Sequence, residues 1–253
     1  MITDTFDDRS PAIIEPLVNE NAPAADACIL TFSDQIFSAV LAQFACRQIG
    51  VLHAVDGAQP VYLFPHRGKT FAFFKTSVGA PACVGTVEQV RSIVRTEKFV
   101  VFGGAGCLDR DIAHGKVMVP TFAWRDEGTS YHYAPAADTI SIKNAAAVAA
   151  FMRENGIPCV CGGVWTTDAF FRETKGNFEK RKAAGCIAVD MECAALQAMC
   201  DFRDLALYTF FTSGDLLDAP VWDQRKKEGQ IEGTQHDAGH FDIALALAQY
   251  VTR

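Results

Sequence analysis

The sequence predicts a single α/β domain. Short apolar runs suited to buried strands alternate with amphipathic or alanine-rich stretches suited to helices, over most of the 253 residues. No repeat, low-complexity tract or long linker divides the chain, and the hydrophobic content of 49 % is enough for one sizeable core. We therefore expect a polar, proline-containing arm over residues 1–26, suited to lying on a neighbouring subunit, and one domain over residues 27–253.

Charge and cysteine content exclude several functional classes. The net charge is −7 and the pI is near 5.3, so the sequence lacks the excess of basic residues that is typical of a nucleic-acid or membrane-surface protein. The first ten residues are polar and acidic, unlike a secretory signal, and no apolar run reaches the length of a membrane helix. Most of the nine cysteines lie in apolar runs, which indicates reduced thiols in a cytoplasmic protein. We expect no nucleic-acid or membrane partner.

Each element follows from local pattern. Apolar runs predict strands, and 3-4-7 spacing or alanine enrichment with capping residues predicts helices. Ser33 is a suitable N-cap for the first helix, and Gly50 a suitable end. The expected strands are 27–32, 61–64, 69–76, 99–102, 116–122, 159–165, 186–189 and 205–212. The expected helices are 34–49, one beginning near Pro81, 144–155, 178–184, 193–200 and 235–250.

The most informative stretch is residues 186–197. A buried-strand pattern gives way there to a helix, and Asp190, Met191 and Glu192 stand at the junction. Ligands of open α/β sheets bind at the carboxyl ends of strands, where an acid can accept hydrogen bonds from hydroxyl groups. The alternative is structural: acids also cap helices, and methionines also fill cores.

The segment V-D-M-E-C-A-A-L at 189–196 resembles the Met-Glu signature of the nucleoside phosphorylase superfamily, which contains uridine phosphorylase, hexameric purine nucleoside phosphorylase and nucleosidases. The resemblance implies a mixed, twisted central sheet flanked by helices, the phosphorylase/hydrolase-like fold. It also implies that Glu192 binds ribose hydroxyls and that Met191 packs against the sugar. Asp190 is the adjacent candidate for ribose binding.

Two further segments resemble the phosphate side of that family. Gly103-Gly104-Ala105-Gly106 corresponds to its glycine-rich loop, and residues 76–81 to its Thr-Gly-x-Gly-Gly-Pro segment. Glycines let backbone N–H groups approach an anion, although a tight turn is the alternative. The phosphate candidates are Thr31, Ser77, Gly103 and Gly104. Two family arginines are replaced, one by Val101 and one within 31–35, which keeps hydrolysis by water open.

The base candidates follow the strand expected at 159–165. By resemblance, Phe170 stacks on the base, and Arg172 is placed to donate a hydrogen bond to it. The alternative for Phe170 is a place in the core, which we expect for one of Phe170 and Phe171. The alternative for Arg172 is a solvated surface charge. Asp215, in the expected loop 213–215, resembles the family's acid that protonates purine N7. Its alternative is an ordinary turn residue. Asp215 and Glu192 are therefore the catalytic candidates.

The predicted function is a nucleoside phosphorylase, a pentosyltransferase that releases free base and ribose 1-phosphate. The alternatives are a phosphate-independent nucleoside hydrolase and an inactive nucleoside-binding protein. A dinucleotide oxidoreductase is disfavoured because the G-x-G-x-x-G fingerprint is incomplete. We expect no metal and no organic cofactor, with phosphate as co-substrate. A homo-oligomer, a dimer or hexamer, is implied by the resemblance.

Overall fold

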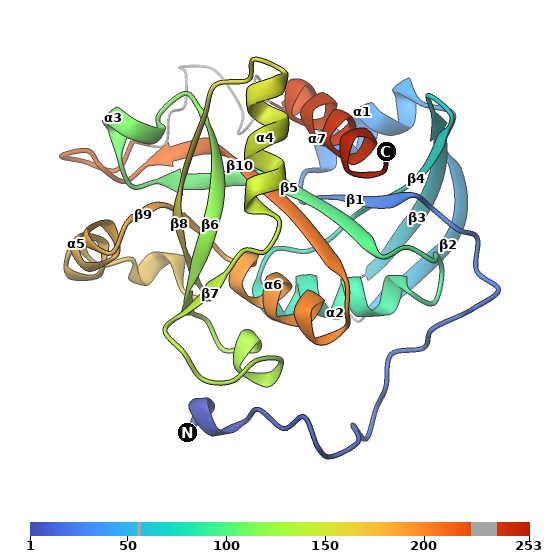
Figure 1. Cartoon of the computed structure of the whole chain (residues 1–253), viewed down its shortest axis with the longest axis horizontal. Helices are drawn as coiled ribbons and strands as arrows, with labels where there is room; N and C mark the ends of the chain where they lie inside the picture. The colour runs from blue at the N-terminus through green and yellow to red at the C-terminus, as the bar shows by residue number, and fades with distance from the viewer. Residues whose placement is uncertain (55–56, 224–236) are drawn as a thin grey trace.

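The computed structural model describes residues 1–54, 57–223 and 237–253 (Figure 1). Its strands are β1 (Ala27–Thr31), β2 (Arg47–Ala54), β3 (Gly57–His66), β4 (Lys69–Lys75), β5 (Lys98–Cys107), β6 (Val117–Asp126), β7 (Thr139–Ser141), β8 (Cys159–Thr167), β9 (Cys186–Asp190) and β10 (Ala206–Leu216). Its α-helices are α1 (Asp34–Gln43), α2 (Ala80–Val90), α3 (Arg110–Ala113), α4 (Ala145–Glu154), α5 (Lys175–Ala183), α6 (Cys193–Phe202) and α7 (Asp237–Val251). Single 3-10 turns are η1 (Ile2–Asp4), η2 (Thr129–His132) and η3 (Phe170–Arg172).

The strands form one mixed sheet, as the sequence predicts. Its order is β10-β6-β8-β9-β5-β1-β4-β3-β2, with β7 beside β6. β10 also pairs in parallel with β5, so the first five strands of this order close on themselves while β1, β4, β3 and β2 extend outward. The closed part brings the ends of β5, β9 and β10 together.

Helices cover both faces of the sheet. In Figure 1, α1, α4 and α7 lie on one side, and α2 and α6 lie on the other. Successive side chains of a strand point to opposite faces of the sheet, so each strand contributes to the cores on both faces. In β1, for example, Ala27 and Ile29 belong to the core under α1, α4 and α7, whereas Cys28 and Leu30 belong to the core under α2 and α6. This two-sided burial explains why the strands read as continuous apolar runs.

Helix α1 is shorter than the sequence predicts. Ser33 does cap it, since its Oγ accepts a hydrogen bond from the Ile36 N–H at 3.2 Å. The helix ends at Gln43, and the chain then forms β2, which pairs antiparallel with β3. The prediction of a helix to residue 49 was wrong because Gly50 lies within this strand, where a Cβ would come 2.7 Å from Ile93. Close packing, and not a helix end, requires that glycine.

Two segments expected as loops lie inside strands. β5 continues through the glycine cluster to Cys107, and β10 continues through residues 213–215 to Leu216. The two strands stay paired there, with Thr212 opposite Gly104. A Cβ at Gly106 would lie 2.7 Å from both Val189 and Leu217, so glycine allows this close approach. Cooperative pairing of β5 with β10 therefore outweighs the local preference of glycine for turns.

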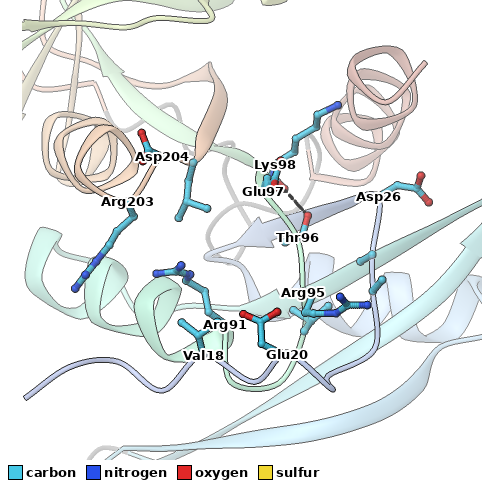
Figure 2. Close-up of a pocket in the computed structure, with 14 residues that line it drawn as sticks. Val18, Glu20, Asp26, Arg91, Arg95, Thr96, Glu97, Lys98, Arg203 and Asp204 are labelled. Carbon is cyan, nitrogen blue, oxygen red and sulfur yellow. Dashed lines mark hydrogen bonds between the residues drawn. The ribbon is translucent and has the colours of Figure 1, made fainter.

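The N-terminal arm lies along its own chain. The Ala25 N–H donates to the Arg95 carbonyl at 2.9 Å, and the Arg95 N–H donates to Pro23 at 3.0 Å. Figure 2 shows the pocket of about 560 Å³ between the arm and the starts of β5 and β10. Two of its arginines make structural contacts. Arg95 Nε donates a hydrogen bond to the Ala22 carbonyl, and Arg203 forms an ion pair with Glu88. Among the described residues, no helix is long and apolar enough to cross a bilayer.

The last helix begins close to its expected position. The sequence predicts residues 235–250, and α7 is Asp237–Val251; residues 235 and 236 lie outside the described part of the chain. Phe241 of α7 packs against aromatic rings from α1's end and from three strands. The ring-centroid distances are 5.7 Å to Phe44, 6.3 Å to Phe64, 5.3 Å to Phe73 and 6.4 Å to Phe102. This cluster fixes α7 over the centre of the sheet.

Candidate active site

A cleft of about 1330 Å³ opens where the carboxyl ends of several strands meet. Residues 103–106 of β5 and residues 214 and 215 of β10 form one wall. Residues 189–192, at the junction of β9 and α6, form another. The segment between β8 and α5 supplies aromatic and charged side chains at the mouth. The sequence-predicted residues Gly103, Gly104, Phe170, the Asp190-Met191-Glu192 segment and Asp215 all line this one cleft.

Both carboxylate oxygens of Asp190 accept hydrogen bonds from neighbouring residues. Its Oδ1 accepts a hydrogen bond from the Thr166 hydroxyl at 2.7 Å, and its Oδ2 accepts from the N–H groups of Glu192 (3.0 Å) and Cys193 (2.6 Å). The Thr166 Oγ1 in turn accepts from the Ala194 N–H at 3.1 Å. Together these groups satisfy N–H donors that the start of α6 leaves open. Burial raises the pKa of Asp190. Its contacts identify it as the residue that orders this turn.

Glu192 stands at the N-cap position of α6 but makes no cap hydrogen bond there. Its Oε1 instead accepts from the Gly79 N–H at 2.5 Å, which ties the start of α2 to the start of α6. Gly79 has φ of +104°, a conformation that L side chains rarely adopt. Glu192 is 8 % exposed, and burial, then the carboxylate of Asp190, raises its pKa. A buried carboxyl group with one oxygen engaged by backbone therefore lines the cleft beside Met191.

Only some of the residues predicted to bind phosphate line the cleft. Gly103 and Gly104 line the cleft, whereas Thr31 and Ser77 do not. The Thr31 hydroxyl accepts from the Ser33 N–H at 3.2 Å, and the Ser77 hydroxyl accepts from Gln59 Nε2 at 3.2 Å. Thr31 and Ser77 are therefore not among the residues that line the cleft, and their role in phosphate binding stays a prediction.

The ring of Phe32 lies over the glycine wall. A Cβ built at Gly103 would lie 3.4 Å from this ring. Phe32 follows β1 directly after Thr31, in the segment that stands where the resembling family has Gly-Asp-Pro-x-Arg. This segment therefore brings a phenyl ring against the glycine wall of the cleft. Sequence reasoning did not identify Phe32 because its contact depends on the pairing of β1 with β5.

The cleft is strongly acidic. Among its described lining residues, six are acidic and one, Lys175, is basic. The acidic residues are Glu173, Glu179, Asp190, Glu192, Asp215 and Asp218. An anion entering the cleft would meet unfavourable charge, whereas hydroxyl and amine donors would find acceptors.

The aromatic mouth is formed by two phenylalanines of η3. The rings of Phe170 and Phe171 lie 4.1 Å apart and are 51 % and 82 % exposed for the whole residue. Neither is in the core, so the expectation that one of them is buried was wrong. Arg172 is exposed and is not among the residues that line the cleft, so its contact with the base stays a prediction. One tight turn at the surface cannot direct three consecutive side chains to the same side.

Asp215 lies in β10, and its two carboxylate oxygens face Trp222 and Gly106. Its Oδ2 accepts a hydrogen bond from Trp222 Nε1 at 2.5 Å, and its Oδ1 would lie 3.2 Å from a Cβ at Gly106. Glu173 lines the same cleft, and burial, then the carboxylate of Asp215, raises the pKa of Glu173 to about 7. Neither Trp222 nor Glu173 was predicted, because no local pattern indicates that these segments meet.

A family model described as "Phosphorylase superfamily" matches residues 27–240 of the chain. The chain belongs to the phosphorylase superfamily. This match confirms the resemblance drawn from residues 189–196 and covers nearly the whole domain. It agrees with the closed, mixed sheet, and it places the cleft within the matched region.

Individual relatives in the superfamily are distant. A DeoD-type purine nucleoside phosphorylase of Exiguobacterium sibiricum is 25 % identical over 158 residues, 60 % of this chain and 66 % of the relative. A uridine phosphorylase of Salmonella typhimurium is 28 % identical over 175 residues, 58 % of this chain and 68 % of the relative. The uncharacterised protein R802 of Acanthamoeba polyphaga mimivirus is 27 % identical over 157 residues, 62 % of this chain and 61 % of the relative. The chain thus spans about three fifths to two thirds of these relatives.

A solved structure shares the superfamily fold. AMP nucleosidase from Bacteroides thetaiotaomicron superposes with a TM-score of 0.67, covering 90 % of this chain and 88 % of that one, at 15 % identity. The likeness shows that the two chains share the α/β fold with the mixed central sheet that the sequence predicts.

Proposed function

We propose that the protein cleaves the N-glycosidic bond of a nucleoside. The observation that carries this proposal is the position of Glu192: its carboxyl group is buried, lines the cleft and accepts a hydrogen bond from the Gly79 N–H. The names of the relatives, purine nucleoside phosphorylase and uridine phosphorylase, support nucleosides as the substrate class.

Each part of a nucleoside has a place in the cleft. Glu192 accepts hydrogen bonds from the ribose hydroxyls, and Met191 packs against the sugar. Phe170 stacks on the base, since aromatic faces stack on any nucleobase. Asp215 protonates the departing base, which lowers the barrier to breaking the bond by general acid catalysis. The pentose passes through an oxocarbenium-like transition state beside Met191 and Glu192.

The described residues favour water over phosphate as the acceptor. Phe32 lies over Gly103, the hydroxyls of Thr31 and Ser77 serve local structure, and Lys175 is the one basic residue among the described lining residues. A phosphate dianion needs charged or well-aligned donors. We therefore propose hydrolysis as the leading version. Phosphorolysis, a pentosyltransferase reaction, is the alternative that the relatives' names favour.

The charge of the cleft also favours nucleosides over nucleotides. Among the described lining residues only Lys175 carries a positive charge for a 5′-phosphate, so AMP is expected to be a poor substrate even though the similar solved structure is an AMP nucleosidase. Adenosine and AMP share a base and a ribose, which makes them a matched pair. We expect release of adenine from adenosine to exceed release from AMP.

One assay tests the proposal. The protein is incubated with purine and pyrimidine nucleosides, with no phosphate and with about 10 mM phosphate, and free base is followed by chromatography. We expect release of base at the same rate in both conditions, with ribose as the second product. Release only with phosphate, together with ribose 1-phosphate, would establish the phosphorylase version. Binding without release in either condition would leave a nucleoside-binding protein and contradict cleavage.

A further inference from the structure

The segment that follows β10 forms a closed loop at the cleft. The Leu216 N–H donates to the Asp223 carbonyl at 2.9 Å, and the Asp223 N–H donates back to the Leu216 carbonyl at 3.3 Å. These two bonds join the ends of residues 217–222. The loop is also tied to α5, because the Asp218 carboxylate forms an ion pair with Lys182 at 3.0 Å. The loop therefore has a defined place beside the cleft.

The side chains that this loop presents to the cleft are mostly apolar. Those that line it, besides Asp218, are Leu217, Ala219, Pro220 and Trp222. Leu217 packs against β5, where a Cβ at Gly106 would lie 2.7 Å from it. The indole of Trp222 is less sheltered, since this residue is 56 % exposed. Apolar groups left open to water around a cleft mark a surface that binds a ligand or a partner.

The cleft has room for more than an unsubstituted nucleoside. Its volume of about 1330 Å³ exceeds the range of about 300–1,000 Å³ that is usual for small-molecule sites. The proposed function assigns the sugar to the junction of β9 and α6, and the base to Phe170 and Asp215. The apolar loop at residues 217–222 therefore has no part of an unsubstituted nucleoside to bind.

The position of Asp215 relates this loop to the substrate. Its Oδ2 accepts a hydrogen bond from Trp222 Nε1 at 2.5 Å, so the indole borders the group proposed to protonate the base. In adenine, N7 and the 6-amino group lie on the same edge of the ring system. A purine held with N7 at Asp215 therefore has its 6-amino group on the edge that faces Asp215 and its neighbour Trp222.

We propose that the preferred substrate is a purine nucleoside with an apolar group on its 6-amino nitrogen, and that Trp222 and its loop bind this group. The inference rests on the proposed function and names the substrate class. The apolar group leaves water as it packs against the indole, which is favourable roughly in proportion to the area buried. An aromatic group gains further from stacking on the indole ring.

The test compares nucleosides that differ only at the 6-amino group. They are adenosine, N6-benzyladenosine and N6-(2-hydroxyethyl)adenosine, whose substituent is polar. For the unchanged protein we expect kcat/KM for N6-benzyladenosine to exceed that for adenosine by about 10-fold, because a phenyl ring is buried. The gain should lie mainly in a lower KM, since this contact is the same in the ground and transition states. The hydroxyethyl group should change kcat/KM by less than about 3-fold, because little apolar area is buried.

Two substitutions separate the apolar surface of Trp222 from its hydrogen bond to Asp215. The readout is the ratio of kcat/KM for N6-benzyladenosine to that for adenosine, which cancels effects on Asp215 that both substrates share. Trp222→Phe removes the N–H donor and keeps an aromatic ring, so most of the ratio should remain. Trp222→Ala removes both, so the ratio should fall to within about 3-fold of one. Thermal unfolding of each variant shows whether the fold is retained.

Binding of free bases distinguishes the inference from the proposed function. Isothermal titration calorimetry compares adenine with 6-benzylaminopurine, and no bond has to be cleaved. Tighter binding of 6-benzylaminopurine that is lost in Trp222→Ala would support the apolar site even if no nucleoside were cleaved, a result that would contradict only the proposed function.

Three results would overturn the inference. Equal kcat/KM values for adenosine and N6-benzyladenosine would remove the apolar group from the substrate while leaving the proposed function intact. An unchanged ratio in folded Trp222→Ala would show that the loop does not bind the substituent. A change in sedimentation of Trp222→Ala, with the ratio kept, would identify the loop as a contact with a second copy of the chain.

Discussion

The Thr166 hydroxyl donates a 2.7 Å hydrogen bond to the Asp190 carboxylate, joining the ends of the neighbouring parallel strands β8 and β9. Asp190 and Glu192 are only two residues apart, yet this bond separates their roles. Asp190 accepts hydrogen bonds from Thr166 and from two backbone N–H groups at the start of α6, whereas Glu192 accepts one from Gly79 across the cleft wall. We therefore assign Asp190 a structural role and propose the functional role for Glu192.

Asp190→Asn should destabilise the fold. The amide offers one acceptor oxygen where the carboxylate uses two, so at least one buried N–H or hydroxyl donor at the start of α6 loses its partner. An unsatisfied buried group costs about 1–3 kcal/mol. Urea denaturation at neutral pH would measure the change. Asp111→Asn, at an exposed position on α3, is the matched control and should stay within about 0.5 kcal/mol of the unchanged protein. A change no larger than that for Asp190→Asn would contradict its structural role.

Gly106→Ala should also destabilise the protein, for a steric reason. The added Cβ would lie 2.7 Å from Val189 and Leu217, and overpacking of this kind costs about 1–3 kcal/mol. Gly104→Ala is the control two residues away in the same strand, because its Cβ would meet nothing within 4 Å. Equal unfolding free energies for the two variants would show that β5, β9 and β10 do not approach each other as closely as described.

The buried carboxyl of Glu192 should make stability depend on pH. Its pKa is raised by burial and by Asp190, so the folded state holds this proton more tightly than the unfolded state does. The resulting stabilisation is complete below the unfolded pKa and is lost as the pH rises through the raised folded pKa. Glu192→Gln, which cannot ionise, should therefore lose less stability on the alkaline side. Parallel stability curves for the two proteins, from urea denaturation at several pH values, would contradict the raised pKa.

Asp215→Asn should reduce cleavage of purine nucleosides more than that of pyrimidine nucleosides. Protonation at a purine ring nitrogen requires an acid, which an amide cannot supply, and loss of a general acid costs about 100-fold or more. The rates of base release from inosine and uridine, compared between the variant and the unchanged protein, give the ratio. An equal loss on both substrates would argue that Asp215 has a structural role, for example as the acceptor for Trp222.

The fold was predictable from the sequence where helices cover a strand on both faces of the sheet. Strands such as β1 and β9 read as continuous apolar runs, and Ser33 marks the start of α1 correctly. Local rules failed where pairing decides the outcome. Gly50 is an internal strand residue and not a helix end, and the glycines of β5 belong to a strand that β10 and β9 hold in place.

The site was predictable only in part. The turn at residues 190–192 and Asp215 were identified, because a family signature or a strand end marks them. The contact of Phe32 with the position of Gly103 joins segments far apart in the chain, and the contact of Trp222 with Asp215 depends on how the chain turns back after β10. No spacing in one sequence reports such contacts. The position of Arg172 along the chain does not determine which way a single surface turn directs its side chain.

The role of Glu192 as the group that grips the pentose is tested most directly by Glu192→Ala, with base release from a nucleoside panel measured beside thermal unfolding. A buried polar group without a partner costs about 1–3 kcal/mol, so two ribose hydroxyls that lose their acceptor lower the rate by about 100-fold. We predict this loss in a protein that remains folded, while Glu97→Gln, outside the cleft, retains full activity. An unchanged rate of base release from folded Glu192→Ala would contradict the account.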